Sequence, residues 1–316
     1  MGKTAFTFPG QGSQAIGMGQ GLAKSYNVAK QVFEQVDEAL NQNLSKIMFE
    51  GNDDELRLTE NAQPALLAVS MAVIKVLEEK GINIENNASF VAGHSLGEYS
   101  ALCAAGTFSL SDAARLLKTR GQAMQQAVPV GQGAMAAIIG LEFEDVIEVA
   151  KQAGQGAICE IANDNANGQV VISGNKEAIE RAIELAKAKG AKRALLLPVS
   201  APFHCSLMCP AAEKMEEALA LVDMQGPIVP LVCNVLAKPI TEPSEIRKRL
   251  VEQVSGMVRW RQSVEWLTNE GEVTQLVELG AGKVLSGLAK RINREVKSVS
   301  LNTPEQIEAF ALELKS

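Results

Sequence analysis

Short apolar runs alternate with longer segments of helical hydrophobic spacing over the first 128 residues. Runs at residues 4–8 and 89–92 predict buried strands. Between them, apolar residues three or four positions apart predict a helix at 28–40 and a second one that Pro64 opens and Gly81 ends. A small-residue helix is expected at 98–105, and Ser111 is expected to cap the next one. This alternation is typical of an α/β fold with a parallel-type sheet.

Residues 133–200 follow a different order of elements. Strands are expected at 134–141, 156–162, 169–173 and 193–199, helices at 144–152 and 176–189, and a turn-rich loop at 163–168. This β-α-β-β-α-β order predicts a ferredoxin-like domain at 129–199. It would be inserted into a large catalytic domain made of 1–128 and 200–316. The large domain is expected to resume with strands near 231–235 and 275–279 and helices near 244–254, 263–268 and 283–293.

Composition narrows the class of protein. The 316 residues are 47% apolar and 21% charged, as in a globular protein with room for two domains. A net charge of −7 disfavours general binding to nucleic acid or anionic membranes, which need a basic surface. Five cysteines without a Cys-x-x-Cys pair, and only two histidines, make a finger-type zinc site implausible, and no metal site is expected. The longest apolar run, at 65–74, is too short to span a membrane, so we expect a cytoplasmic protein.

The segment from Gly93 to Gly97 has the pattern Gly-x-Ser-x-Gly, with Ser95 at its centre. The pattern alone is weak, but here it follows an expected strand and precedes an expected helix. That context is typical of a nucleophile elbow of the α/β-hydrolase type, in which a strained turn exposes a serine at a helix N-terminus. The other interpretation is an ordinary glycine-flanked turn.

A serine hydroxyl needs a general base, and the chain offers only two histidines. His94 adjoins Ser95, where consecutive side chains diverge, so His204 is favoured over it. The acidic residues between Ser95 and His204 in the chain give no convincing third member of a triad. Those weighed are Asp112, Asp145 and Asp164. Orientation of His204 by a backbone carbonyl is the alternative.

Six separated segments, in order along nearly the whole chain, resemble the malonyl-CoA:acyl-carrier-protein transacylases. They are Pro9–Gln14, Gly93–Ala101, Arg120-Gly121 with Met124, Ala201–His204, Glu252-Gln253 before Val258–Trp260, and Glu278–Gly280 with Gly282–Leu285. Asn163 lies in an Asn-rich segment that also resembles the family, although Asn167 stands where the family has proline.

The resemblance implies a role for each matching residue. Ser95 would be the acylated nucleophile and His204 the general base. The main-chain N–H groups of Gln11 and Leu96 would form the oxyanion hole, and the main-chain carbonyl of Gln253 would orient His204. Arg120 would bind the malonyl carboxylate, which suits the fork of a guanidinium. The implied substrate contacts are completed by Met124, Phe203 and Asn163, with Phe203 crowding an α-methyl branch.

The activity implied is transfer of malonyl from malonyl-CoA to the phosphopantetheine thiol of acyl carrier protein, through malonyl-Ser95, in fatty acid biosynthesis. Neither a metal nor a redox cofactor is expected, because coenzyme A is a substrate and phosphopantetheine belongs to the partner. A monomer is expected. The alternatives are a serine hydrolase or thioesterase acting on acyl-CoA, an acyltransferase serving polyketide synthesis, and a non-catalytic carrier-binding subunit.

An acidic carrier protein would need a local basic surface on this acidic chain. Lys290, Arg294 and Lys297 are spaced to share one helical face, with Arg291 beside them. We therefore expect Lys290, Arg291 and Arg294 to dock the carrier protein, against the alternative of an ordinary solvated helix face.

Overall fold

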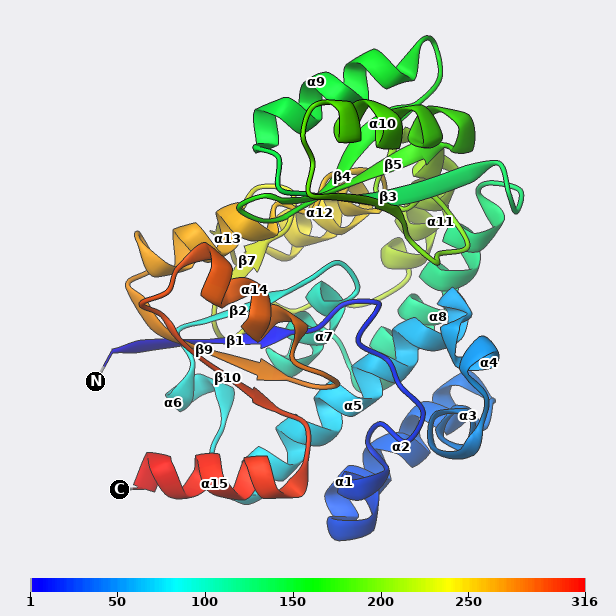
Figure 1. The fold of residues 1–316 in the computed structure, drawn as a ribbon. Coiled ribbons are helices and arrows are strands. Elements are labelled where there is room, and N and C mark those ends of the chain that lie inside the picture. The colour runs from blue at the N-terminus through cyan, green and yellow to red at the C-terminus, as the bar shows by residue number, and fades with distance from the viewer. Residues whose placement is uncertain (1, 316) are drawn as a thin grey trace.

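The computed structural model describes residues 2–315, which form a large unit around a six-stranded sheet and a small unit around a four-stranded sheet (Figure 1). The strands are β1 Lys3–Phe8, β2 Phe90–Gly93, β3 Gly133–Ile139, β4 Cys159–Ala166, β5 Gln169–Asn175, β6 Arg193–Leu196, β7 Leu231–Cys233, β8 Lys238–Ile240, β9 Val273–Leu279 and β10 Lys297–Leu301. The helices are α1 Gln20–Ser25, α2 Asn27–Leu40, α3 Leu44–Glu50, α4 Asp53–Arg57, α5 Thr59–Glu79, α6 Ile84–Asn87, α7 Gly97–Ala104, α8 Leu110–Gln126, α9 Phe143–Gly154, α10 Lys176–Ala188, α11 Cys209–Ala220, α12 Pro243–Ser255, α13 Trp260–Thr268, α14 Val284–Ile292 and α15 Pro304–Lys315.

The large sheet has the strand order β10-β9-β1-β2-β7-β8. Its first five strands are parallel, and β8 is antiparallel to β7 at one edge. Alternating side chains of β1 enter two cores. Phe6 and Phe8 belong to the core shared with α2, α5, α7 and α8, and Ala5 belongs to the core on the face covered by α13 and α14. Burial on both faces explains the nearly continuous apolar runs that predicted the strands. No helix within residues 2–315 is long and apolar enough to cross a membrane.

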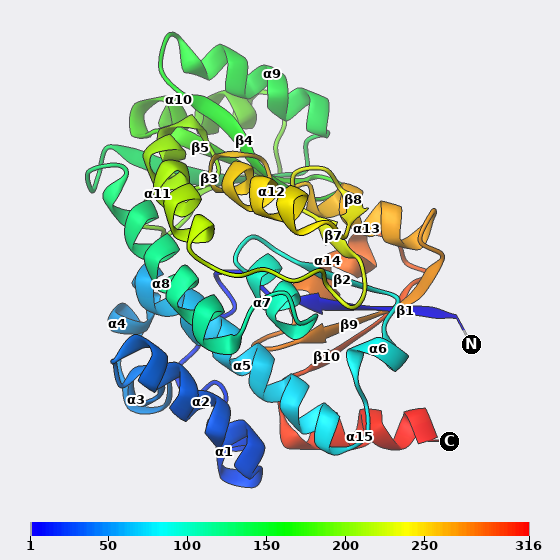
Figure 2. The same cartoon turned by 180° about the vertical axis from the view of Figure 1, so that it is seen from behind.

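The small unit, residues 133–196, is an antiparallel sheet of order β4-β5-β3-β6 with α9 and α10 on its outer face (Figures 1 and 2). Its apolar side chains, such as Ile138, Ile172 and Ile179, form a core of their own. The opposite face lies toward the large unit, where β4 packs against α13 and α14. The chain therefore leaves the large unit after α8 and returns to it before α11.

The prediction that Pro64 opens a helix is wrong, because α5 begins at Thr59 and Pro64 lies inside it. Proline removes one backbone hydrogen bond, which normally disfavours this position. Here the extra turn is buried against α8. A Cβ on Gly121 would come within 2.5 Å of the Glu60 Cα, so the two backbones are in close contact. Tertiary packing thus holds a turn that local preference disfavours.

Two other local predictions are corrected. Ser109, not Ser111, caps α8, because its side chain accepts a hydrogen bond from the Asp112 N–H. The expected loop at 163–168 is mostly strand, since β4 continues to Ala166 and only a two-residue turn separates it from β5. Register irregularities on either side of Asn163 and Asp164 let this polar stretch remain paired with β5.

Candidate active site

Ser95 lies at a sharp turn between β2 and α7 and has a left-handed backbone, with φ of 54°. The glycines on either side allow this turn to pack closely. A Cβ on Gly93 would lie 1.9 Å from the Gly97 carbonyl carbon, and a Cβ on Gly97 would lie 2.2 Å from the Phe8 carbonyl oxygen. The strand, turn and helix around Ser95 therefore have the geometry expected of a nucleophile elbow.

His204 meets Ser95 from the segment between the small unit and α11. The Ser95 hydroxyl donates to His204 Nε2 across 2.7 Å. On the other side of the ring, Nδ1 donates to the main-chain carbonyls of Gln253, at 2.9 Å, and Gly256, at 3.2 Å. These carbonyls fix the tautomer that leaves Nε2 free to accept a proton. No carboxylate is needed to orient the ring.

The three aspartates weighed from the sequence have other partners. Asp112 pairs with Arg115 at 2.8 Å, Asp145 with Lys189 at 3.1 Å, and Asp164 with Arg261 at 2.8 Å. The first pair lies within α8, and the other two join neighbouring elements, so each carboxylate is engaged by a partner other than His204. These pairings agree with the failure to find an acidic third member in the sequence.

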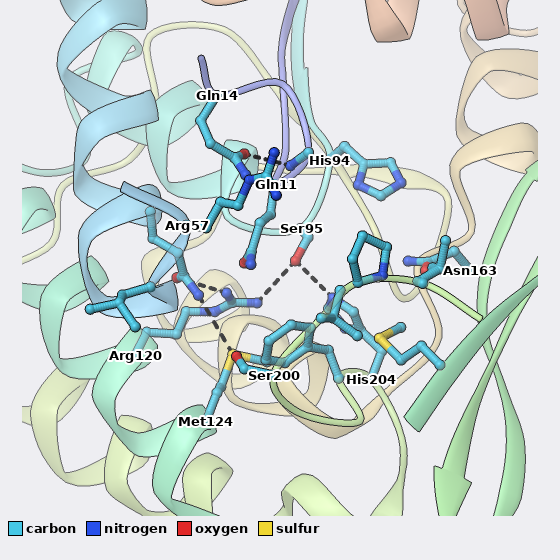
Figure 3. Close-up of a pocket in the computed structure, with 18 of the residues that line it drawn as sticks. Gln11, Gln14, Arg57, His94, Ser95, Arg120, Met124, Asn163, Ser200 and His204 are labelled. Atoms are coloured by element: carbon cyan, nitrogen blue, oxygen red, sulfur yellow. Dashed lines mark hydrogen bonds between the residues drawn. The ribbon is translucent and has the colours of Figure 1, made fainter. Parts of the chain in front are cut away.

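His94 is partly buried, and its ring is held by residues other than Ser95. Its Nε2 lies 2.8 Å from Asn165 Oδ1, and its ring centroid lies 5.6 Å from that of Trp260. The Asn165 contact joins the elbow to β4 of the small unit, and the Trp260 contact joins it to α13. They direct the ring away from Ser95, and Figure 3 shows His94 on the side opposite Arg120.

Burial and, next to it, the positive charge of Arg120 lower the pKa of His204 to about 3. The imidazole is therefore neutral at physiological pH. A neutral ring with a free Nε2 can accept the Ser95 proton. Any negative charge placed beside Arg120 would make that transfer easier, because it would offset the guanidinium's repulsion of the developing imidazolium.

Arg120 lies on α8 with only 1% of its surface exposed. Its Nη2 donates to Ser95 Oγ at 3.1 Å (Figure 3) and to Gln253 Oε1 at 2.9 Å, and its Nη1 donates to Gln63 Oε1 at 2.9 Å. Its Nε is buried and has no hydrogen-bond partner within residues 2–315. A buried guanidinium beside a nucleophile and with donor capacity to spare is suited to bind an anionic acyl group.

Two residues that sequence reasoning missed support this arrangement. Asn234 accepts from the Ser95 N–H at 2.8 Å and donates to the Gly93 carbonyl at 2.7 Å, so it braces the elbow. Its signal was available, because it directly follows the buried strand β7, and carboxyl ends of parallel strands meet at one edge. Gln63, which holds Arg120, offered only the weaker signal of a polar residue beside an apolar run.

A cavity of about 600 Å³ opens in front of Ser95 and is lined by residues of both units. Its walls include most of the residues predicted from sequence, namely Gln11, Ser95, Arg120, Met124, Asn163, Phe203 and His204. Gln253 is fully buried behind the nucleophile, and Leu96 occupies the position before α7 with its side chain in the core. The chain within residues 2–315 has no cluster of three or more side chains suited to a metal ion.

Comparison with known proteins identifies this arrangement. Residues 5–302 match the acyl transferase domain family. The malonyl CoA-acyl carrier protein transacylase of Bacillus subtilis is 49% identical over 316 residues, covering 100% of this chain and 98% of that protein. The crystal structure of an acyl-carrier-protein-S-malonyltransferase from Bartonella henselae aligns with a TM-score of 0.97 at 57% identity, covering 99% of this chain and all of the other. The chain belongs to the malonyl-CoA–acyl carrier protein transacylase family.

Another solved transacylase is in complex with a type II PKS acyl-carrier protein. It aligns with a TM-score of 0.95 at 45% identity, covering 99% of each chain. Of the segments that carried the family resemblance, those containing Gln11, Ser95, Arg120 and His204 reach the cavity. The segment around Glu278 does not. Its carboxylate accepts from the N–H groups of Leu285, at 3.0 Å, and Ser286, at 2.8 Å, at the start of α14.

The expectation that Lys290, Arg294 and Lys297 share one helical face is wrong. Helix α14 ends at Ile292, and Asn293 is extended, so Arg294 lies beyond the helix and Lys297 begins β10. Strand β10 forms because Val299 and Leu301 alternate with polar residues and pair with β9. Lys290, Arg291 and Arg294 are nevertheless exposed. Arg291 donates to Gln169 Oε1 of the small unit at 2.6 Å.

Proposed function

We propose that this chain is a malonyl-CoA:acyl-carrier-protein S-malonyltransferase that works through a malonyl ester of Ser95. The observation that carries the proposal is the position of one hydroxyl between two groups. Ser95 Oγ lies 2.7 Å from His204 Nε2 and 3.1 Å from Arg120 Nη2. The first contact serves nucleophilic attack, and the second places a fixed positive charge where the far end of a short dicarboxylic acyl group would lie.

In the first half-reaction, His204 takes the Ser95 proton while Oγ attacks the malonyl thioester carbon. The main-chain N–H groups of Gln11 and Leu96 would hold the developing oxyanion, and each such donor contributes roughly 3–4 kcal/mol in comparable sites. The carbon–sulfur bond then breaks, and coenzyme A leaves with the proton from His204. An oxygen ester has replaced a thioester, and the site is neutral again.

The second half-reaction reverses these steps with a different thiol. The phosphopantetheine thiol of the carrier protein gives its proton to His204 and attacks the malonyl ester. Ser95 leaves and recovers the proton. Every step uses groups of this chain and the two thiols alone, so we propose that no cofactor takes part.

Arg120 distinguishes malonyl from uncharged acyl groups in this proposal. The free carboxylate of malonyl would form charge-assisted hydrogen bonds with the guanidinium, which an acetyl group lacks. Met124 and Phe203 supply the apolar walls of the same cavity, and Asn163 supplies a polar group from the small unit. Named relatives that transfer malonyl to acyl carrier protein support this choice of substrates.

The remaining proposals concern the pathway, the location, the oligomeric state and the domain division of the enzyme. Fatty acid synthesis is the role that the named relatives favour, with polyketide synthesis as the alternative raised by the PKS complex. We also propose a cytoplasmic monomer.

The chain would divide into two domains. Its large domain, 1–128 with 200–316, would be hydrolase-like, and its inserted domain, 129–199, would be ferredoxin-like, as the order β4-β5-β3-β6 supports. Limited proteolysis near residues 128 and 200 tests the division.

Intact-mass measurement after brief incubation with malonyl-CoA alone tests the function. We expect a gain of one malonyl group, mapped to Ser95, absent in Ser95→Ala and discharged when holo-acyl carrier protein is added. Release of coenzyme A with accumulation of free malonate and no lasting adduct would instead indicate a hydrolase. Absence of both adduct and release would overturn the choice of acyl donor.

A further inference from the structure

Glu98 is a buried carboxylate directly behind the nucleophile, three residues after Ser95 in the first turn of α7. It is 1% exposed. One carboxylate oxygen accepts from the main-chain N–H of Asn234 at 2.8 Å, and the other accepts from the side-chain amide of Gln253. Burying an ionised carboxylate costs a large desolvation free energy. Glu98 nevertheless takes no part in the proton transfers described above.

The side-chain amide of Gln253 lies between Glu98 and Arg120. Its Oε1 accepts from Arg120 Nη2 at 2.9 Å, while its Nε2 donates to the Ser95 carbonyl at 2.9 Å and to Glu98. An ionised carboxylate can only accept hydrogen bonds, and a guanidinium can only donate them. The amide therefore has one orientation that satisfies both neighbours.

We propose that Glu98 is a positioning residue that fixes the orientation of the Gln253 side-chain amide, and through it holds Arg120 ready for a carboxylate-bearing acyl group. The proposal rests on the malonyl transfer inferred above and names a residue that sets its acyl preference. It is separate from the orientation of His204, which uses the main-chain carbonyl of Gln253.

Replacing Glu98 by glutamine shows why the charge matters. The main-chain N–H of Asn234 cannot turn away, so the new amide must offer it the oxygen and direct its NH₂ toward Gln253. Two NH₂ groups then face each other. If the Gln253 amide rotates to relieve this, its own NH₂ faces Arg120, and its oxygen faces the Ser95 carbonyl. Either arrangement leaves buried groups unpaired and loosens Arg120.

The test compares malonyl-CoA and acetyl-CoA as donors to holo-acyl carrier protein in wild-type and variant enzymes. For Glu98→Gln we expect the ratio of the two kcat/KM values to fall about 10-fold, mostly through a higher KM for malonyl-CoA. Glu98→Asp, which keeps an acceptor-only group, should retain more of the ratio. Gln253→Met removes the amide but keeps the main-chain carbonyl on His204, so it should lower the ratio as Glu98→Gln does.

Glu278→Gln is the matched control. It also replaces a buried glutamate that accepts two hydrogen bonds, but its partners lie at the start of α14. We expect it to leave the ratio unchanged. Equal losses of malonyl and acetyl transfer in Glu98→Gln, with an unchanged ratio in Gln253→Met, would overturn the proposal and leave Glu98 a structural brace. If the wild-type enzyme forms no malonyl-Ser95, the proposed function itself fails, and that result is read independently of any variant.

Discussion

Glu98, behind Ser95, and Glu278, a β9 residue whose carboxylate accepts from the start of α14, are each 1% exposed, and burial raises the pKa of both. Glu278 accepts from two main-chain N–H groups, whose directions are already set by helix α14. Glu98 accepts from one main-chain N–H and from the rotatable amide of Gln253. A buried charge whose partners are all fixed can only stabilise the fold. One that orients a mobile group also selects which surface that group presents to a neighbour, here Arg120.

The largest expected loss of activity is at Arg120, the last residue of the hydrogen-bonded series Glu98, Gln253 and Arg120. Arg120→Ala should lower kcat/KM for malonyl-CoA by about 100-fold, the loss expected for charge-assisted hydrogen bonds to a carboxylate. Acetyl transfer should fall less, because acetyl makes no such bonds. Steady-state kinetics with both donors measures this. Arg115→Ala, an exposed site on the same helix, is the control. A preserved malonyl preference in Arg120→Ala would show that the carboxylate is bound elsewhere.

Replacing Glu278 should lower the stability of the fold and leave the acyl preference unchanged. Glu278→Gln places an NH₂ against one of two buried main-chain N–H groups, so we expect a loss of about 1–3 kcal/mol in the free energy of unfolding. Chemical denaturation monitored by circular dichroism measures it. The malonyl to acetyl ratio should stay unchanged. A shift in that ratio would remove the contrast between the two glutamates.

A pH profile separates the two regions further. Burial raises the pKa of Glu98 to about 7, so the carboxylate becomes protonated as pH falls through that value. The titratable groups facing it are Arg120, Cys233 and Tyr99. A guanidinium keeps its proton in proteins, so Arg120 stays charged, and burial raises the pKa values of Cys233 and Tyr99 further above 7. Glu98 alone among these groups therefore changes charge near neutral pH.

We expect the malonyl to acetyl ratio of the wild-type enzyme to fall several-fold between about pH 8.5 and pH 5.5, with a midpoint near 7. Protonation removes the acceptor-only character of Glu98, as Glu98→Gln does permanently. The ratio of Glu98→Gln should therefore be flat over this range, and that of Glu278→Gln should follow the wild type. His204, with a pKa of about 3, does not titrate in this window. A sloping profile in Glu98→Gln would assign the titration to another group.

The contrast between local and long-range features also explains what the sequence could predict. Ser95 was found because the elbow is encoded within five residues, by glycines that the close packing demands. His204 was found because the chain has one other histidine. The strand β1 and the helix α2 were likewise predictable, because the spacing of apolar residues within each segment follows its buried face.

Features set by distant contacts were harder to predict. The turn of α5 before Pro64 depends on Gly121 of α8, and the bracing of Ser95 depends on Asn234, far along the chain. The side-chain amide of Gln253, on α12, hydrogen-bonds both Arg120 and Glu98. The spacing of these residues in the sequence does not indicate that they meet. The helical interpretation of Lys297 failed because pairing of β10 with β9 overrides it.

The smallest expected effect concerns the far end of α14, the helix whose first N–H groups donate to Glu278. Lys290 and Arg291 lie in the last turn of α14 and are exposed, so they remain candidates for docking an acidic carrier protein. Exposed charges contribute up to about 1 kcal/mol each, so Lys290→Glu with Arg291→Glu should raise the KM for the carrier about 3- to 10-fold.

The KM for malonyl-CoA should stay constant in this double variant, and the defect should shrink at high salt, because screening weakens exposed charges. Lys151→Glu with Lys187→Glu makes the same charge change on α9 and α10, at the outer face of the small unit (Figure 1). If both double variants raise the carrier KM equally, net charge rather than docking at α14 is responsible. If neither does, the carrier binds another face, and α14 serves the fold alone, as Glu278 does at its start.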